Sequence, residues 1–209
     1  MTRSARPSPD RRQFSHRIGQ AVTRFDPLDR PRSANLQTAV KAIDGTTLAT
    51  AQEWSFNAAT GPRIAPAYQD AGVLQAGRRV DGPGGGVCQV SSTLYWASFQ
   101  AGLEIIERHP HGMVAPYLPA GADATVSLWQ DLKLRNPFTH PVRLLMRVDG
   151  DRLVADIMAT EPRKPCHPIR REQPARLNGQ RALRVTVWRE SPHGDRELMS
   201  DDTYVVPGR

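Results

Sequence analysis

A chain of 209 residues, of which 39% are hydrophobic, has room for one domain with appendages and enough apolar side chains for a core. Its 18 prolines and 16 glycines exclude a protein built mainly of long helices. The net charge of +7 comes mostly from arginines spread through both ends of the chain, which is typical of a solvated surface.

The amino-terminal part of the chain is rich in arginine, proline and serine, and we expect residues 1–32 to form a basic, flexible arm. Four apolar side chains recur there at near-helical spacing and predict a short amphipathic helix over Ser15–Phe25: Phe14, Ile18, Val22 and Phe25. The arm has no apolar stretch like that of a secretory signal, and no run reaches the length of a membrane span. We therefore expect a cytoplasmic protein without a transmembrane segment.

Residues 33–160 have the pattern of one α+β domain whose helices come early. Asn35–Ile43 places its apolar residues on one face and is followed by the turn pair Asp44-Gly45, so it predicts a helix. Trp54–Asn57 predicts a short strand, and residues 65–77 predict a loop or a broken helix.

The central element is a helix over Val87–Ala101 that is entered from a glycine loop and ended by Gly102. Five apolar residues form the stripe that we expect to face the core: Val87, Val90, Leu94, Ala97 and Ala101. Three consecutive glycines before the helix give a backbone that can adopt positive φ and approach other groups closely: Gly84, Gly85 and Gly86.

The second half of the chain predicts strands of a mainly antiparallel sheet. They are Leu103–Arg108, Asp123–Trp129, Asp131–Arg135, Val142–Val148 and Arg152–Ala159, with a hairpin turn at Asp149-Gly150 between the last two. We expect residues 161–180 to be a linker rich in proline and arginine. Residues 181–209 predict a carboxy-terminal β-hairpin made of Leu183–Glu190 and Arg196–Val206.

Cys88 lies in the first turn of the central helix. Free N–H groups and the positive end of the helix dipole gather there, and both favour a thiolate over a thiol. The alternative is that Cys88 is a small buried hydrophobic residue, as many free cysteines are. Cys166 lies in the Pro/Arg-rich linker, and we do not expect it to form a disulfide with Cys88.

Cys88, His111 and Asp123 follow one another in the order seen in transglutaminase-like and papain-like thiol enzymes. An imidazole can hold the thiol as a thiolate, and a carboxylate can fix the imidazole tautomer. His109 is an alternative base. Each residue also has a structural alternative, because a histidine at a strand end often caps carbonyls and an aspartate often holds a turn.

Residues around the helix start are candidates for ligand binding, because N–H groups at this position can hold an oxyanion, a carboxylate or a phosphate. We include the glycine loop and the polar side chains near Cys88: Gly84, Gly85, Gly86, Gln89, Ser91, Ser92 and Tyr95. The serines can instead bond back to the preceding turn.

Metal, nucleotide and nucleic-acid binding have weaker support. His109 and His111 could join Cys88 or Asp123 at a zinc ion, but no paired Cys or His motif accompanies them, and we expect no metal or cofactor. The glycine run lacks the lysine and hydroxyl residue of a phosphate loop. No basic motif with interleaved aromatic residues predicts specific nucleic-acid recognition.

Several ordered motifs resemble the VanW family, named for an accessory protein of bacterial vancomycin-resistance clusters. They are SANLQTAVKAIDGTTL, WSFNAATGPR, GGGVCQVSSTLYWASFQAGLEIIERHPHG and LPAGADATVSLWQDLKLRN, and the likeness runs from about Ser33 to Thr160. The resemblance implies an association with the cell wall but no defined reaction. Two functions remain open: cysteine-dependent acyl transfer or hydrolysis on a peptide-like substrate, and non-catalytic binding of a peptidoglycan precursor or a partner protein.

Overall fold

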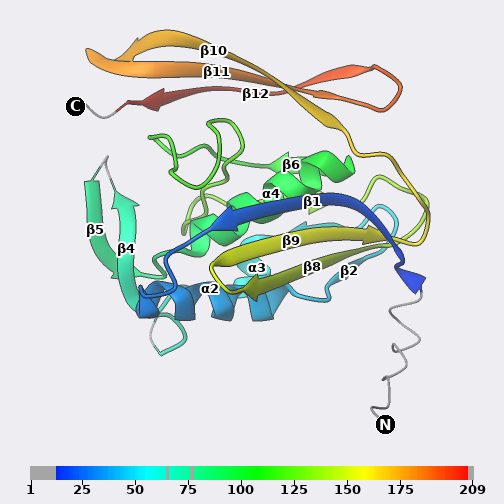
Figure 1. Ribbon diagram of the computed structural model, residues 1–209, viewed down its shortest axis with the longest axis horizontal. Coiled ribbons are helices and arrows are strands. Elements are labelled where there is room, and N and C mark those ends of the chain that lie inside the picture. Colours follow the sequence, from blue (N-terminus) through cyan, green and yellow to red (C-terminus); the bar gives the residue numbers. More distant parts are fainter. Residues whose placement is uncertain (1–12, 65, 76–77, 207–209) are drawn as a thin grey trace.

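The computed structural model describes residues 13–64, 66–75 and 78–206 (Figure 1). Its largest sheet has four antiparallel strands in the order β1–β9–β8–β2. The strands are β1 (His16–Arg24), β9 (Arg152–Ala159), β8 (Val142–Asp149) and β2 (Thr47–Leu48). The predicted hairpin of β8 and β9 is confirmed, although its turn is at Gly150-Asp151, one residue beyond the predicted pair, because Asp149 still pairs with Arg152.

The prediction of a helix in a flexible arm is wrong for residues 16–24, which form β1. This strand pairs with β9 from His16 opposite Ala159 to Arg24 opposite Arg152. The near-helical spacing of apolar residues was misleading because Ile18 is buried whereas Val22 is 45% exposed. Pairing with a distant strand outweighs the local pattern. Residues 1–12 of the expected arm lie outside the described residues.

Two helices cover one face of this sheet. Helix α2 (Arg30–Ile43) contains the predicted Asn35–Ile43 and begins earlier, because Asp29 accepts a hydrogen bond from Arg32 N–H as its N-cap. Helix α4 (Val87–Ala101) has the predicted bounds. It packs on β1 and β9, while α2 packs on β8 and on α4. None of the helices in the described ranges is long and apolar enough to cross a membrane.

Helix α4 is buried almost all round, not along one stripe, since 12 of its 15 residues are buried. Its contact with β1 is close. A Cβ at Gly19 would lie 2.3 Å from the carbonyl oxygen of Ala97 and 2.9 Å from Cβ of Ala101. Only glycine fits at this position, and the close approach fixes the helix on the sheet.

Two smaller sheets flank α4. One has three strands in the order β3–β7–β6: β3 (Glu53–Ser55), β7 (Lys133–Arg135) and β6 (Glu104–Glu107). A short helix, α3 (Phe56–Thr60), follows β3. The other is a hairpin of β4 (Asp70–Gln75) and β5 (Arg78–Pro83), which stands at one side of the molecule in Figure 1. Residues 70–75 are thus a strand, not the expected loop. Residues 123–129, expected as a strand, are a loop.

The carboxy-terminal sheet has three strands in the order β10–β11–β12: β10 (His167–Leu177), β11 (Gln180–Glu190) and β12 (Arg196–Val205). The expected linker over residues 161–180 therefore contains a strand. Pro168 and Pro174 fit because β10 is an edge strand that pairs only with β11 in this sheet. Figure 1 shows this sheet on the side of α4 opposite α2, and its Val185 and Val187 belong to the core.

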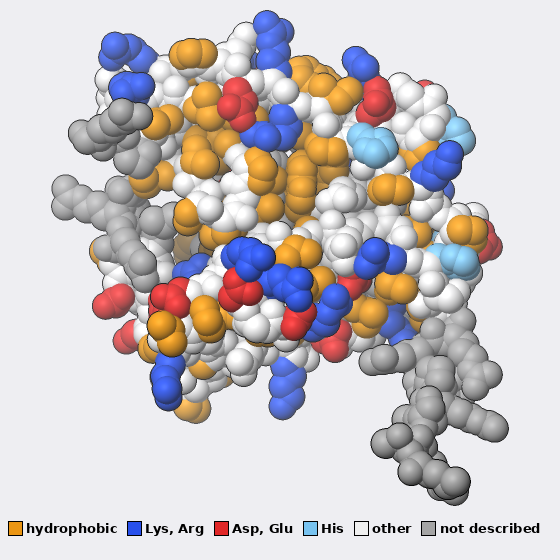
Figure 2. Space-filling view, in the orientation of Figure 1, with side chains coloured by type: hydrophobic (Ala, Val, Ile, Leu, Met, Phe, Trp, Pro, Cys, Tyr) orange, Lys and Arg blue, Asp and Glu red, His pale blue; other side chains and the backbone are white. Residues whose placement is uncertain are grey.

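The outer face of the main sheet carries paired charges. Figure 2 shows basic and acidic side chains close together there. Asp156 forms ion pairs with both Arg17 and Arg147, and Arg24 pairs with Asp151. Many of the arginines that give the chain its positive charge are therefore compensated at the surface. All strand pairs within the described sheets are antiparallel, so the α+β class with a mainly antiparallel sheet is confirmed.

Candidate active site

The glycine loop brings the chain to the start of α4. Gly84 and Gly86 have φ of 76° and 102°, and Gly86 is the N-cap residue. A Cβ at Gly85 would lie 2.5 Å from the carbonyl carbon and oxygen of Ala71 in β4. All three glycines are therefore needed to let the loop pass this close to its neighbours. Cys88 follows in the first turn of the helix.

Asn35 of α2 anchors the glycine loop through its side-chain amide. The sequence did not predict this role. Its amide nitrogen donates to the carbonyls of Gln69 and Gly85 at 2.9 and 3.0 Å. Its amide oxygen accepts from Gln69 N–H at 2.8 Å. The side chain is buried and fully bonded, so it fixes the loop relative to α2.

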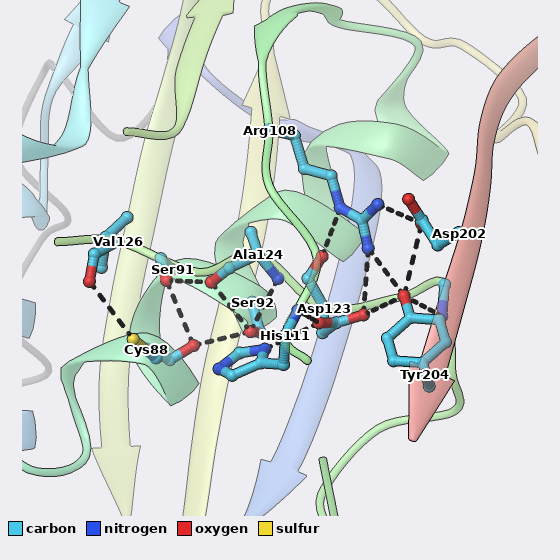
Figure 3. A network of polar contacts seen from close by, with 11 residues as sticks. Cys88, Ser91, Ser92, Arg108, His111, Asp123, Ala124, Val126, Asp202 and Tyr204 are labelled. Carbon is cyan, nitrogen blue, oxygen red and sulfur yellow. Dashed lines mark hydrogen bonds and ion pairs between the residues drawn. The ribbon is translucent and has the colours of Figure 1, made fainter. Parts of the chain in front are cut away.

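Cys88, His111 and Asp123 are brought together, as their order in the sequence suggested (Figure 3). Nδ1 of His111 lies 2.7 Å from Oδ2 of Asp123, which also accepts from His111 N–H at 2.7 Å. A carboxylate can only accept, so Nδ1 carries a proton and Nε2 is the nitrogen left on the side of Cys88. The Cys88 thiol donates to the carbonyl oxygen of Val126 at 3.5 Å, and its side chain lines the same cavity as the imidazole of His111.

The electrostatics of this group favour a thiolate–imidazolium pair. Burial raises the pKa of Cys88, but the hydrogen bond and positive charge of His111 outweigh it, so the thiol pKa is lowered. Burial lowers the pKa of His111, yet its hydrogen bonds with Asp123 and Cys88 raise it to about 9. Burial raises the pKa of Asp123, but His111 and Arg108 hold it below its usual range. Each shift therefore favours the charged form of its group.

A buried polar network lies behind Asp123. The Arg108 guanidinium donates to Oδ1 of Asp123 at 3.0 Å and pairs with Asp202. The Tyr204 hydroxyl donates to the same Oδ1 at 2.7 Å and accepts from Gly121 N–H at 2.9 Å. Tyr204 is fully buried. Both Tyr204 and Asp202 come from β12, so the carboxy-terminal sheet supplies part of the site.

The loop after Asp123 is fixed by the two serines of α4. Ser92 Oγ accepts from Ala124 N–H at 2.9 Å and donates to Cys88 O at 2.6 Å. Ser91 Oγ donates to Ala124 O at 2.7 Å. Both serines were candidates for ligand binding. In the structure they connect the turn of Cys88 to the segment that carries Asp123.

A cavity of about 280 Å³ opens in front of Cys88. Its walls come from the glycine loop, the β4–β5 hairpin, the loop after His111 and two arginines. The lining residues include Gly84, Gly86, Arg32, Arg63, Tyr117 and Gln130. A second cavity of about 340 Å³ shares Arg32 and Tyr117 with the first. The reactive side of Cys88 therefore faces a space that can hold a small ligand.

Three of the predicted site residues have other partners. His109 hydrogen-bonds with Glu107 at 3.0 Å, so the structure selects His111 as the histidine beside Cys88. The Gln89 amide donates to Thr23 Oγ1 at 3.0 Å and is 1% exposed, although Gln89 also lines the cavity. Tyr95 is buried under the guanidinium of Arg108. Within the described residues, no three His, Cys, Asp or Glu side chains gather as a metal site.

Comparison with known proteins gives two curated relatives. The uncharacterized protein YoaR of Bacillus subtilis (strain 168) is 35% identical over 150 residues, which are 70% of this chain and 49% of YoaR. The vancomycin B-type resistance protein VanW of Enterococcus faecalis (strain ATCC 700802 / V583) is 28% identical over 145 residues, 65% of this chain and 52% of VanW. The chain spans about half the length of these relatives. No solved structure gives a significant match.

The family model described as VanW like protein matches residues 31–158, which include the glycine loop, α4, Cys88, His111 and Asp123. The match covers more than half of the chain and agrees with the motifs from which the resemblance was inferred. The protein therefore belongs to the VanW family.

Proposed function

We propose that this protein is a cysteine-dependent acyl-transfer enzyme or hydrolase that acts on an amide of a peptide-like, cell-wall-related substrate. One observation carries the proposal. Cys88 and His111 line the same cavity, and Nδ1 of His111 is held at 2.7 Å by the buried carboxylate of Asp123. Nucleophile, base and orienting group thus stand in the order that nucleophilic catalysis needs.

The reaction runs in two halves. The Cys88 thiolate attacks the amide carbonyl carbon, so that a C–S bond forms and the carbonyl π electrons move onto oxygen. When the tetrahedral species collapses, the C–N bond breaks and the leaving nitrogen takes a proton from Nε2 of His111. Water or an acceptor amine then adds to the thioester and gives a proton to His111. The C–S bond breaks, and the thiolate–imidazolium pair is restored.

The oxyanion of the tetrahedral species needs donors near the Cys88 sulfur. Val87 N–H and Gln89 N–H bond to the carbonyls of Gly84 and Gly86, at 3.0 and 2.8 Å. Cys88 N–H lies between them in the first turn of α4, and we assign it as the donor to the oxyanion. The positive end of the helix dipole adds to its effect.

The cell-wall assignment of the substrate rests on the family. One relative is a vancomycin resistance protein by name. The cavity would then receive a peptide of a wall precursor.

The test is the pH dependence of Cys88 alkylation by iodoacetamide in a Cys166→Ser background. We expect rapid reaction at pH 6, because the thiolate persists well below the ordinary thiol pKa of about 8.5. His111→Ala should slow the reaction at pH 6 by at least about tenfold. His109→Ala is the matched control, because its ring pairs with Glu107, and it should leave the profile unchanged.

A profile that follows an ordinary thiol, or that is indifferent to His111→Ala, would overturn the enzyme proposal. The cavity would then belong to a non-catalytic module that binds a wall precursor or a partner protein. A mass spectrum of the protein after incubation with peptide substrates adds a second readout. An acyl adduct on Cys88 that is lost in Cys88→Ser supports the reaction directly.

A further inference from the structure

Arg63 stands in the wall of the cavity beside Cys88. It follows α3, and the carbon chain of its side chain lies against Gly84, where an added Cβ would come within 3.0 Å of Arg63 Cβ. Its guanidinium donates to the side-chain oxygen of Asn57, a neutral acceptor. Nε of Arg63 is buried and has no hydrogen-bond partner among the described residues. A buried donor without an acceptor is costly, which suggests that it serves a ligand.

The charge of Arg63 is poorly balanced by its surroundings. The described residues that line the cavity include no aspartate or glutamate. Asp131 is the nearest influential carboxylate, but it accepts from Asn57 N–H and Leu132 N–H and acts on Arg63 less than Cys88 does. A Cys88 thiolate would be the main balancing charge for Arg63, and acylation would consume it.

Arg32 is the second arginine of the cavity wall, but it is engaged elsewhere. It donates to the Gln89 amide oxygen at 2.8 Å and faces the second cavity, whose walls include Asp26 and Asp29. Arg32 thus has carboxylates in the wall of its second cavity, whereas the cavity beside Arg63 has none among its described lining residues. The ligand that suits Arg63 is an anion small enough to share the cavity with the reacting carbonyl group.

We propose that Arg63 binds a carboxylate of the substrate next to Cys88, so that the substrate class is a peptide with a free carboxylate close to the amide that reacts. A planar guanidinium can donate two parallel hydrogen bonds to a planar carboxylate. The described residues of the cavity wall include no aspartate or glutamate that would compete for it. The inference rests on the proposed function for the reaction, but the binding site stands on the cavity and Arg63 alone.

The test compares two reagents of nearly equal size, iodoacetate and iodoacetamide, on Cys88 in a Cys166→Ser background. Each forms a C–S bond with the thiolate and expels iodide, but only iodoacetate carries a carboxylate. The ratio of their rate constants therefore reports on charge next to Cys88 and is independent of the thiolate fraction. Divided by the same ratio for 2-mercaptoethanol, it should exceed about fivefold in favour of iodoacetate.

Arg63→Gln should lower this ratio at least about fivefold, because the ratio cancels any change in the thiolate fraction that the lost charge causes. Arg184→Gln makes the same charge change at an exposed site on the carboxy-terminal sheet and should leave the ratio unchanged. A ratio that Arg63→Gln does not alter would overturn the proposal. Slow iodoacetamide labelling with an ordinary thiol profile would contradict the enzyme proposal, while the ratio would still test Arg63.

A second measurement needs no variant and covers the case in which Arg63→Gln does not fold. Acetate should protect Cys88 from iodoacetamide at a concentration at which acetamide does not, because only the anion is held by Arg63. The ionic strength is kept constant with sodium chloride. Equal effects of acetate and acetamide would also overturn the proposal.

Discussion

The two sides of the His111 ring differ in almost every physical respect. On the Nδ1 side, Asp123, Arg108, Asp202 and Tyr204 form a closed network whose charges are balanced and whose donors and acceptors are paired. On the Nε2 side, Cys88 faces a cavity lined by Arg63. The buried Nε of this arginine has no hydrogen-bond partner among the described residues. The closed side fixes the orientation of the ring, and the open side leaves the ring next to the cavity.

The difference between the two sides indicates which residues should affect the stability of the fold and which should affect the reactivity of Cys88. The closed side is built from the segment between β6 and β7 and from β12, and its groups cannot be removed without leaving a buried charge or donor alone. The open side is built from the glycine loop and one long arginine. We therefore expect substitutions on the closed side to lower the free energy of unfolding and those on the open side to change reactivity.

The largest effect is expected for Asp123→Asn. The variant leaves Arg108 and His111 without the carboxylate that both contact, so the free energy of unfolding should fall by about 3–5 kcal/mol. The measurement is urea unfolding at pH 7. Asp151→Asn is the matched control, because Asp151 pairs with Arg24 at the surface, and its loss should cost less than about 1 kcal/mol. If both variants lost the same free energy of unfolding, the network behind His111 would be no more important for stability than a surface ion pair.

A smaller loss is expected for Tyr204→Phe. It removes a hydroxyl that donates to Asp123 and accepts from Gly121 N–H, so unfolding should become easier by about 1–3 kcal/mol. If Tyr204 also positions the ring, the pH profile of Cys88 alkylation should move towards that of an ordinary thiol. Tyr68→Phe loses a single 3.2 Å bond to Thr60 O and should cost less and leave the profile alone. An unchanged profile in Tyr204→Phe would limit the tyrosine to a structural role.

The thiolate–imidazolium pair predicts a particular dependence of stability on pH. The unfolded chain titrates its histidine near 6.5 and its cysteine near 8.5. A folded thiolate–imidazolium pair would hold, between these values, a proton on His111 that the unfolded histidine lacks, and would lack the one that the unfolded cysteine holds. The two differences cancel, so the pair should add no slope between about pH 6.5 and 8.5. Its contribution should fall above about pH 9 and at acidic pH.

Cys88→Ser breaks this cancellation. His111 still has its raised pKa through Asp123, so the folded state now binds more protons than the unfolded state above pH 6.5. Relative to the parent protein, the variant should lose stability as the pH rises from 6.5 to 8.5, with a slope of at most about 1.4 kcal/mol per pH unit. Urea unfolding at several pH values measures this. Parallel curves for the two proteins would mean that Cys88 is a neutral thiol.

The smallest effect on stability is expected for Arg63→Gln on the open side. Its described hydrogen bond goes to the neutral Asn57, so the free energy of unfolding should change by less than about 1 kcal/mol. The same variant should abolish the preference of Cys88 for iodoacetate. A large loss of stability would show that Arg63 belongs with the closed side of the ring.

The sequence predicted the central helix and the grouping of Cys88, His111 and Asp123 because the signals are local and ordered. Glycines bracket α4 at both ends, and φ of 80° at Gly102 matches its predicted role in ending the helix. The strands β8 and β9 were predicted for the same reason, since a turn pair separates two apolar runs.

The missed elements depend on partners that are distant in the sequence. Residues 16–24 become a strand only because β9 offers an edge to pair with, and β10 tolerates two prolines only as an edge strand. The roles of Tyr204 and Arg63 have no local signature. Each is set by which loop the fold places beside Asp123 or Cys88, and neither spacing nor residue type could have shown it.

The place of Tyr204 in the chain has a consequence for biosynthesis. Cys88, His111 and Asp123 leave the ribosome well before Tyr204, which is 81 residues beyond Asp123. Until β12 is made, Asp123 lacks its hydroxyl donor and Arg108 lacks Asp202. Val205 N–H then bonds to Gly112 O, directly after His111, and closes the site. The surroundings of Asp123 and His111 are therefore complete only after the last strand has docked.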